Sequence, residues 1–109
     1  MSSISTHVLD MVLGRPAAGV VLRLESHDHG AWVEYCESAT DRDGRCRDLA
    51  PDAPPGTYRL VFRTGEYLAR SGRRGIYPEI AITFICDGGE HYHLPVLLSD
   101  NGYTTYRGS

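Results

Sequence analysis

The sequence lacks the long apolar runs, the signal peptide and the excess of positive charge that are typical of membrane, secreted and nucleic-acid-binding proteins. No apolar run approaches the roughly 20 residues of a membrane-spanning helix. The first residues lack a charged segment followed by an apolar one, so we expect no signal peptide. The formal net charge is −3, whereas nucleic-acid binding needs a surface rich in positive charge. The short basic cluster Arg70, Arg73 and Arg74 is interpreted as a solvated helix end or loop. We therefore expect no membrane and no nucleic-acid partner.

Cysteine is scarce as well. Cys36, Cys46 and Cys86 are an odd and widely spaced set, which favours reduced thiols over a disulfide scaffold. A bridge between Cys36 and Cys46 across a turn is the alternative. Reduced thiols are typical of the cytosol, so we expect a cytoplasmic protein.

What the chain does contain is a repeated alternation of apolar and polar residues, the period of a β-strand. A length of 109 residues predicts one domain, residues 1–109. The only plausible helix covers residues 66–72 and closes at Gly72. We interpret Asp43-Gly44 as a tight turn and residues 51–56 as a loop. The spacing of the alternating segments and turns predicts roughly eight short strands, and hence an all-β sandwich. Seven of these segments are residues 4–10, 19–26, 32–37, 57–64, 79–86, 91–99 and 103–107.

The segment 91–99, H-Y-H-L-P-V-L-L-S, is the most informative of these strands. Alternation places one apolar set on a core face, namely Tyr92, Leu94, Val96 and Leu98. The opposite face is mixed and carries His91, His93, Pro95, Leu97 and Ser99. Such a face is typical of a strand that borders a cleft or a partner. Incidental histidines on a solvated face are the alternative.

Two further residues could add to such a cleft. His7 shares a strand face with Ser5 and Leu9, and Arg45 directly follows the Asp43-Gly44 turn. Each is more simply a structural or solvated residue when taken alone. Together with the histidines of 91–99, they offer proton transfer near pH 7 and a guanidinium that can hold a planar anion.

Several of these segments together resemble the transthyretin-like 5-hydroxyisourate hydrolases. The resemblance runs end to end through S-T-H-V-L-D, G-R-P-A-A-G-V, D-G-R, G-T-Y-R-L-V-F-R-T-G-E-Y, Y-P-E-I, H-Y-H-L-P-V-L-L-S and Y-R-G-S. The final Y-R-G-S is the most specific of them, because it distinguishes the hydrolases from the hormone-carrying transthyretins of the same fold.

The resemblance implies a transthyretin-like sandwich of two four-stranded sheets with one short helix, assembled as a homotetramer. Substrate sites would lie in a channel between dimers, without cofactor or metal. The family's catalytic residues match His7, Arg45, His93 and Ser109. Substrate-binding residues match His7 and Arg45 together with Tyr106, Arg107 and Gly108. His27 and His29 lie outside the family motifs and receive no role.

The implied reaction is the hydrolysis of 5-hydroxyisourate to 2-oxo-4-hydroxy-4-carboxy-5-ureidoimidazoline, the second step of urate degradation to allantoin. Water opens a cyclic amide, which needs a base and groups that stabilise a developing oxyanion. His7 and His93 can supply the proton transfers, and Arg45 and Arg107 can hold the anionic ring. We favour His7 as the base. Whether Ser109 acts through its hydroxyl or its carboxylate stays open.

Two other functions are compatible with parts of the sequence. A transthyretin-type carrier without catalysis would keep the sandwich but would not need His7, Arg45, His93 and the final tetrapeptide together. A metal hydrolase could use His91 and His93 as ligands, with His7 as a third. The family resemblance points away from both.

Overall fold

A computed structural model of the chain describes residues 1–109, apart from the side chain of Asp48. Over these residues the chain forms nine strands and one short helix. In chain order they are β1 (Ser2–Asp10), β2 (Arg15–Pro16), β3 (Val21–Asp28), β4 (Ala31–Ala39), β5 (Arg45–Ala53), β6 (Gly56–Phe62), α1 (Thr64–Ala69), β7 (Ile80–Cys86), β8 (His91–Ser99) and β9 (Gly102–Thr105).

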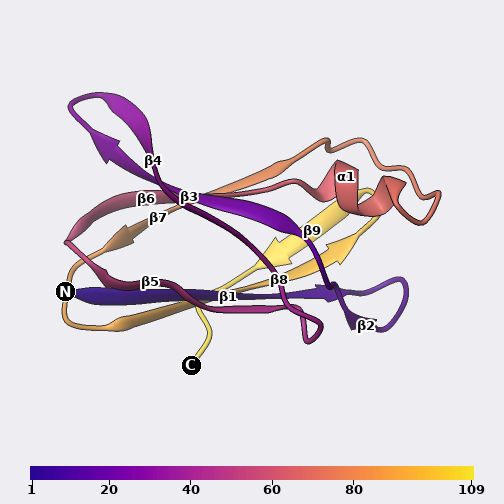
Figure 1. Cartoon of the computed structure of the whole chain (residues 1–109), viewed down its shortest axis with the longest axis horizontal. Helices are drawn as coiled ribbons and strands as arrows, with labels where there is room; N and C mark the ends of the chain where they lie inside the picture. The colour runs from indigo at the N-terminus through magenta and orange to yellow at the C-terminus, as the bar shows by residue number, and fades with distance from the viewer.

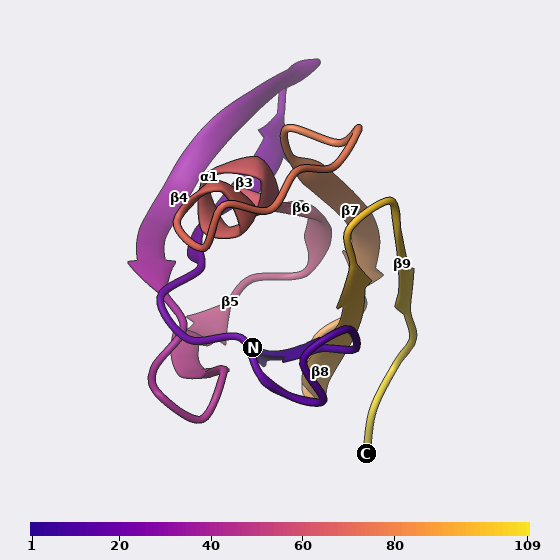
Figure 2. The same ribbon diagram turned by 90° about the vertical axis from the view of Figure 1, so that its right-hand side faces the viewer.

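Two sheets face each other in a sandwich, with α1 at one end (Figures 1 and 2). One sheet has the order β4-β3-β6-β7. The other has the order β5-β1-β8-β9, and the two-residue β2 pairs with the far end of β1. β1 and β8 run parallel, whereas the other pairs are antiparallel. The predicted transthyretin-like sandwich of two four-stranded sheets with one short helix is confirmed.

The core between the sheets is built from alternate residues of each strand. Ile4 and Val8 of β1 and Val96 of β8 are fully buried and meet Leu24 and Leu60 from the opposite sheet within one apolar cluster. Burying each such side chain stabilises the fold by roughly 1.5–3 kcal/mol. The predicted core face of β8 is confirmed, and its odd-numbered residues are therefore left on the outer face of the sheet.

The strand β5 is absent from the sequence prediction. The predicted loop 51–56 is wrong for Pro51–Ala53, which belong to β5, and for Gly56, which begins β6. The sequence R-C-R-D-L-A-P-D-A does not alternate regularly, and its pairing with β1 shifts register twice. A proline is tolerated here because β5 is an edge strand, paired with β1 alone in its sheet. The predicted helix is confirmed but begins and ends earlier, at Thr64 and Ala69.

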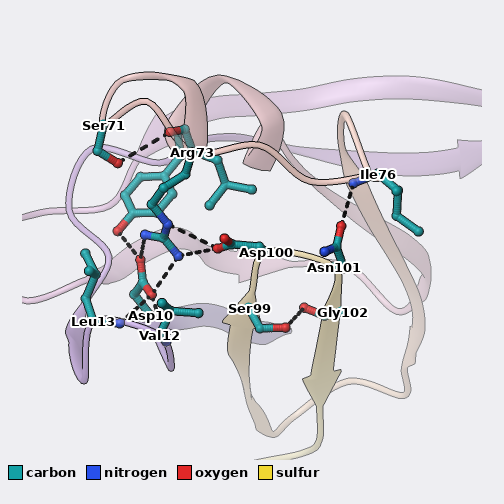
Figure 3. Close-up of polar contacts among 12 residues, drawn as sticks. Asp10, Val12, Leu13, Ser71, Arg73, Ile76, Ser99, Asp100, Asn101 and Gly102 are labelled. Atoms are coloured by element: carbon teal, nitrogen blue, oxygen red, sulfur yellow. Dashed lines mark hydrogen bonds and ion pairs between the residues drawn. The ribbon is translucent and has the colours of Figure 1, made fainter.

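The interpretation of Arg73 as a solvated residue is wrong. Its guanidinium binds both carboxylate oxygens of Asp10, a side chain with 0% exposure at the end of β1, and Asp100 Oδ1 at 2.6 Å just after β8 (Figure 3). Tyr67 of α1 donates a further hydrogen bond to Asp10 Oδ2 at 2.8 Å. Burial would raise the pKa of Asp10, but the hydrogen bonds from Arg73, the Leu13 N–H and Tyr67 outweigh it and lower the pKa to about 2. This network joins α1 and the segment that follows it to the ends of β1 and β8, the two central strands of their sheet.

Cys36, Cys46 and Cys86 are free thiols in the structure. Within the described residues, no helix is both long enough and apolar enough to cross a membrane.

Candidate active site

Three neighbouring strands bring the predicted site residues onto the outer face of one sheet. The parallel register of β1 and β8 sets Ser3 beside His91 and Ser5 beside His93. The antiparallel register of β1 and β5 sets His7 beside Arg45. Residues far apart in the sequence therefore share one surface because β1 lies between β5 and β8.

A cavity of about 250 Å³ opens on this surface. Its lining contains three of the predicted catalytic residues, Arg45, His93 and Ser109. The same cavity is lined by residues without a predicted role, namely Ser5, Thr6, Arg47 and His91. The cavity thus combines imidazole, guanidinium and hydroxyl groups, the set needed to hold an anion and move protons.

His93 is half-buried in this cavity. Its Nδ1 lies 2.8 Å from Ser5 Oγ. Burial lowers the pKa of His93 below its usual value of 6.5; the positive charge of Arg45 lowers it further, as do His91 and His7 when they are protonated. At pH 7 the ring is accordingly neutral, with one nitrogen that donates and one that accepts.

His7 does not line the cavity but lies at its edge, beside Arg45. Its Nε2 lies 2.9 Å from the carbonyl oxygen of Asp43. Because a carbonyl oxygen only accepts, Nε2 carries the proton. Nδ1 of neutral His7 consequently keeps its lone pair and can take a proton.

The turn before β5 fixes both Arg45 and the carbonyl that holds His7. Asp41 Oδ1 accepts hydrogen bonds from the N–H groups of Asp43 at 2.9 Å and Arg45 at 3.0 Å. Gly44 has a φ of +74°, and a Cβ there would collide with the carbonyl oxygen of Val8. The predicted tight turn therefore requires glycine at position 44.

The C-terminal tail lies beside β8 next to His93. The predicted strand 103–107 ends at Thr105, and the tail then continues along β8 to an antiparallel bridge between Gly108 and His93. The Gly108 N–H donates to the carbonyl oxygen of His93 at 2.7 Å. A Cβ on Gly108 would lie 2.8 Å from His93 Cδ2, so only glycine allows this approach. The contact brings Ser109 to the cavity.

Tyr106 and Arg107 do not line the cavity of the single chain. Tyr106 is exposed. The Arg107 guanidinium lies 4.3 Å above the Tyr92 ring and 3.7 Å from Glu90 Oε1, and it donates to the carbonyl oxygen of His91 at 3.4 Å. The structure therefore brings together Arg45, His93 and Ser109, with His7 beside them, and leaves these two side chains outside.

The model of the HIUase/transthyretin family matches residues 4–108. The chain belongs to this family. It is 44% identical to a 5-hydroxyisourate hydrolase of Salmonella typhimurium, over 97% of this chain and 80% of that protein. The structure of Klebsiella pneumoniae 5-hydroxyisourate hydrolase matches with a TM-score of 0.88 and 39% identity, covering both chains completely. Transthyretin from Sparus aurata matches with a TM-score of 0.93 and 30% identity, over 97% of this chain and 96% of that one.

The family motifs mark Arg45, His93 and Ser109 of this cavity but give no role to the other four lining residues, Ser5, Thr6, Arg47 and His91. Arg47 follows Arg45 by two positions, and this spacing would have placed both on one face if β5 had been predicted. Ser5 was noted only for sharing a face with His7. The family motif assigns a catalytic role to His93 and none to His91, although the structure links the two rings through Ser5.

Among the described residues, no group of three or more His, Cys, Asp or Glu side chains is arranged to hold a metal ion. Nε2 of His91 and Nδ1 of His93 are both hydrogen-bonded to Ser5 Oγ, at 3.0 Å and 2.8 Å. The two histidines on this face therefore share a hydroxyl.

Proposed function

We propose that this protein hydrolyses 5-hydroxyisourate, opening its cyclic amide in the degradation of urate. The observation that carries the proposal is the cavity where neutral His93, Arg45 and Ser109 meet in a chain of the HIUase/transthyretin family. The 5-hydroxyisourate hydrolases among its relatives support the same substrate.

The proposed chemistry follows from the charges of the cavity. Arg45 and Arg47 attract the anionic heterocycle and stabilise negative charge on the carbonyl oxygen when water adds. His7 takes a proton from the attacking water at Nδ1, the nitrogen left free by the hydrogen bond to Asp43. His93 delivers a proton to the ring nitrogen that leaves the carbonyl carbon.

The tail completes the proposed site. Gly108 holds the tail against His93, and Ser109 closes one side of the cavity. Tyr106 and Arg107 are substrate-binding residues in this proposal, contributing once subunits assemble around the channel. The assembly is a homotetramer of a hydrolase domain that spans residues 1–109. A cytoplasmic location fits the three free thiols.

The test is a coupled assay in which urate oxidase supplies 5-hydroxyisourate and its ultraviolet absorbance is followed. We expect the decay to accelerate in proportion to the protein added, and to do so equally after exhaustive chelation. A decay rate unchanged by the protein would identify a carrier. Activity that disappears on chelation and returns with zinc would identify a metal hydrolase.

A further inference from the structure

Four side chains on the outer face of β1 and β8 form one continuous hydrogen-bonded chain. Ser3 Oγ contacts Nδ1 of His91, Nε2 of His91 lies 3.0 Å from Ser5 Oγ, and Ser5 Oγ lies 2.8 Å from Nδ1 of His93. The rings of His91 and His93 are nearly parallel, with an interplanar angle of 13° and centroids 6.3 Å apart. The parallel register of the two strands produces this order, because it pairs Ser3 with His91 and Ser5 with His93.

The proton content of this chain allows two arrangements. The Ser5 hydroxyl has one proton, so it donates to one ring and accepts from the other. If Ser5 donates to His93, then His93 carries its own proton on Nε2. If Ser5 donates to His91, then His93 carries its proton on Nδ1 and Nε2 has the lone pair. Switching between the arrangements changes the nitrogen that bears the proton in both rings while both stay neutral.

The surroundings of His93 favour such a neutral switch over an imidazolium. The ring is half-buried, and the groups facing it are Arg45 from β5, His7 and Ser5 from β1, and His91 from its own strand. Ser109 of the tail lines the same cavity. On the tail side, Gly108 packs against His93 Cδ2 and limits the rotation of the ring. A half-buried ring that is held in place beside the positive charge of Arg45 transfers protons most easily when its own charge does not change.

We propose that Ser5 and His91 form a proton relay behind His93, through which His93 gives up a proton at Nε2 without becoming charged. The inference rests on the proposed hydrolase function. Ser5 and His91 are positioning residues in this scheme, because they act on the substrate through His93.

The relay balances in protons. The Nε2–H bond of His93 breaks, and its proton goes to the leaving ring nitrogen of the substrate. The Ser5 hydroxyl proton moves to Nδ1 of His93, and the Nε2 proton of His91 moves to the Ser5 oxygen. Nδ1 of His91, on an exposed side chain, takes a replacement proton from solvent water through Ser3. After the product leaves, a proton from water binds Nε2 of His93, the transfers run in reverse, and one proton returns to solvent from Nδ1 of His91 through Ser3, which resets the chain for the next turnover.

Two substitutions interrupt the relay at different points. Ser5→Ala removes the hydroxyl between the rings, and His91→Gln keeps an amide N–H but cannot pass a proton on. We expect each to lower kcat by about tenfold to a hundredfold while KM changes little, whereas His93→Asn lowers kcat by about 10²-fold or more. The double variant should be no slower than the slower single one, because either change already breaks the chain. Ser71→Ala, near the helix and far from the site, is the control.

A proton inventory in mixtures of H₂O and D₂O separates a relay from a structural role. In the unchanged protein, a plot of kcat against the deuterium fraction of the solvent should be curved, as transfer of several protons requires. For Ser5→Ala the same plot should be linear. The relay would be overturned if a variant lowers kcat but leaves the proton inventory curved, or if it changes KM and leaves kcat as it was. If Ser5→Ala disturbs folding, His91→Gln gives the same test at an exposed position.

A second measurement does not depend on turnover. The ¹⁵N shifts of His93 report which ring nitrogen carries the proton, and we expect Ser5→Ala to change that distribution at pH 7. If the protein does not hydrolyse 5-hydroxyisourate but Ser5→Ala still changes the ¹⁵N shifts, the proposed function is contradicted, whereas the hydrogen-bonded coupling of the two rings is supported. Unchanged ¹⁵N shifts in an active protein would contradict the relay alone.

Discussion

Gly108 shows how a single residue without a side chain can set the geometry of the site. Its N–H is bonded to the carbonyl oxygen of His93, and the space where a Cβ would lie is taken by the imidazole. The φ of Gly108 is not in the left-handed region, so the requirement for glycine here is one of space alone.

We predict that Gly108→Ala lowers kcat/KM by about tenfold or more, because the tail or the His93 ring must shift. The fold should be unaffected, since the tail lies outside the core. Gly102→Ala is a matched control: a Cβ there meets Ser99 Oγ at 3.5 Å, an ordinary contact. The coupled urate oxidase assay and a thermal melt measure both effects. Equal activity of the two variants would remove Gly108 from the site.

Arg73 is a second single residue whose role the sequence conceals. Its partners Asp10 and Asp100 are 63 and 27 positions away, so no local pattern could distinguish it from its solvated neighbour Arg74. The cluster was visible in the sequence, but its burial depends on the packing of α1 against the ends of two strands.

We predict that Arg73→Ala costs about 3–5 kcal/mol in the free energy of unfolding at pH 7, because Asp10 is left buried and charged. Arg74→Ala should cost little. The folded-state pKa of Asp10, about 2, lies below its usual value of 3.8, so the pair stabilises the protein above about pH 4 and loses this contribution toward pH 2. The difference between the unchanged protein and Arg73→Ala should therefore shrink as the pH falls. Urea unfolding at pH 7 and pH 3 measures it, and a constant difference would contradict the ion-pair account.

At the scale of elements, regular strands could be predicted and irregular ones could not. β8 begins and ends where its alternation does, at His91 and Ser99. β5 could not be predicted because its pairing with β1 shifts register and its residues do not alternate regularly. Without that strand, no pattern indicated that Arg47 lies on the same face as Arg45. The family motifs marked His93 without showing that Ser5 joins it to His91. That link follows only from the parallel register of β1 and β8, which no local pattern specifies.

The tail is an element defined by its contact with β8 rather than by its own regular structure. We predict that a few residues appended after Ser109 leave the melting temperature unchanged and reduce activity strongly, because Ser109 already fills one side of the cavity. Deleting Tyr106–Ser109 should have the same two effects, since the apolar core lies in the strands before it.

The control carries the same extra residues before Met1, which is exposed. Activity is followed in the coupled assay and folding by circular dichroism. Full activity with residues after Ser109 would show that the tail need not close the cavity in the way we propose.

The whole molecule carries surfaces that suit assembly. Met11, Val12 and Leu13 lie next to one another in the loop after β1, with exposures of 57%, 56% and 42%. β7 and β9 are the last strands of their sheets and lie at the same side of the sandwich (Figure 2). Neighbouring apolar side chains and free strand edges are both typical of surfaces that pair with another chain.

We predict a homotetramer with two-fold symmetries, and we expect Val12→Glu to weaken it by placing a charge in the exposed apolar loop. Val33→Glu is the control, because Val33 is also exposed but lies in the β3–β4 hairpin at the opposite end of the molecule from β2 (Figure 1). Light scattering at micromolar concentration measures the mass, and the coupled assay is run on the same samples. If the channel between dimers forms the complete site, Val12→Glu should lose mass and activity together. An unchanged protein that is a stable monomer and fully active would contradict both the assembly and the roles proposed for Tyr106 and Arg107, which reach no cavity within one chain.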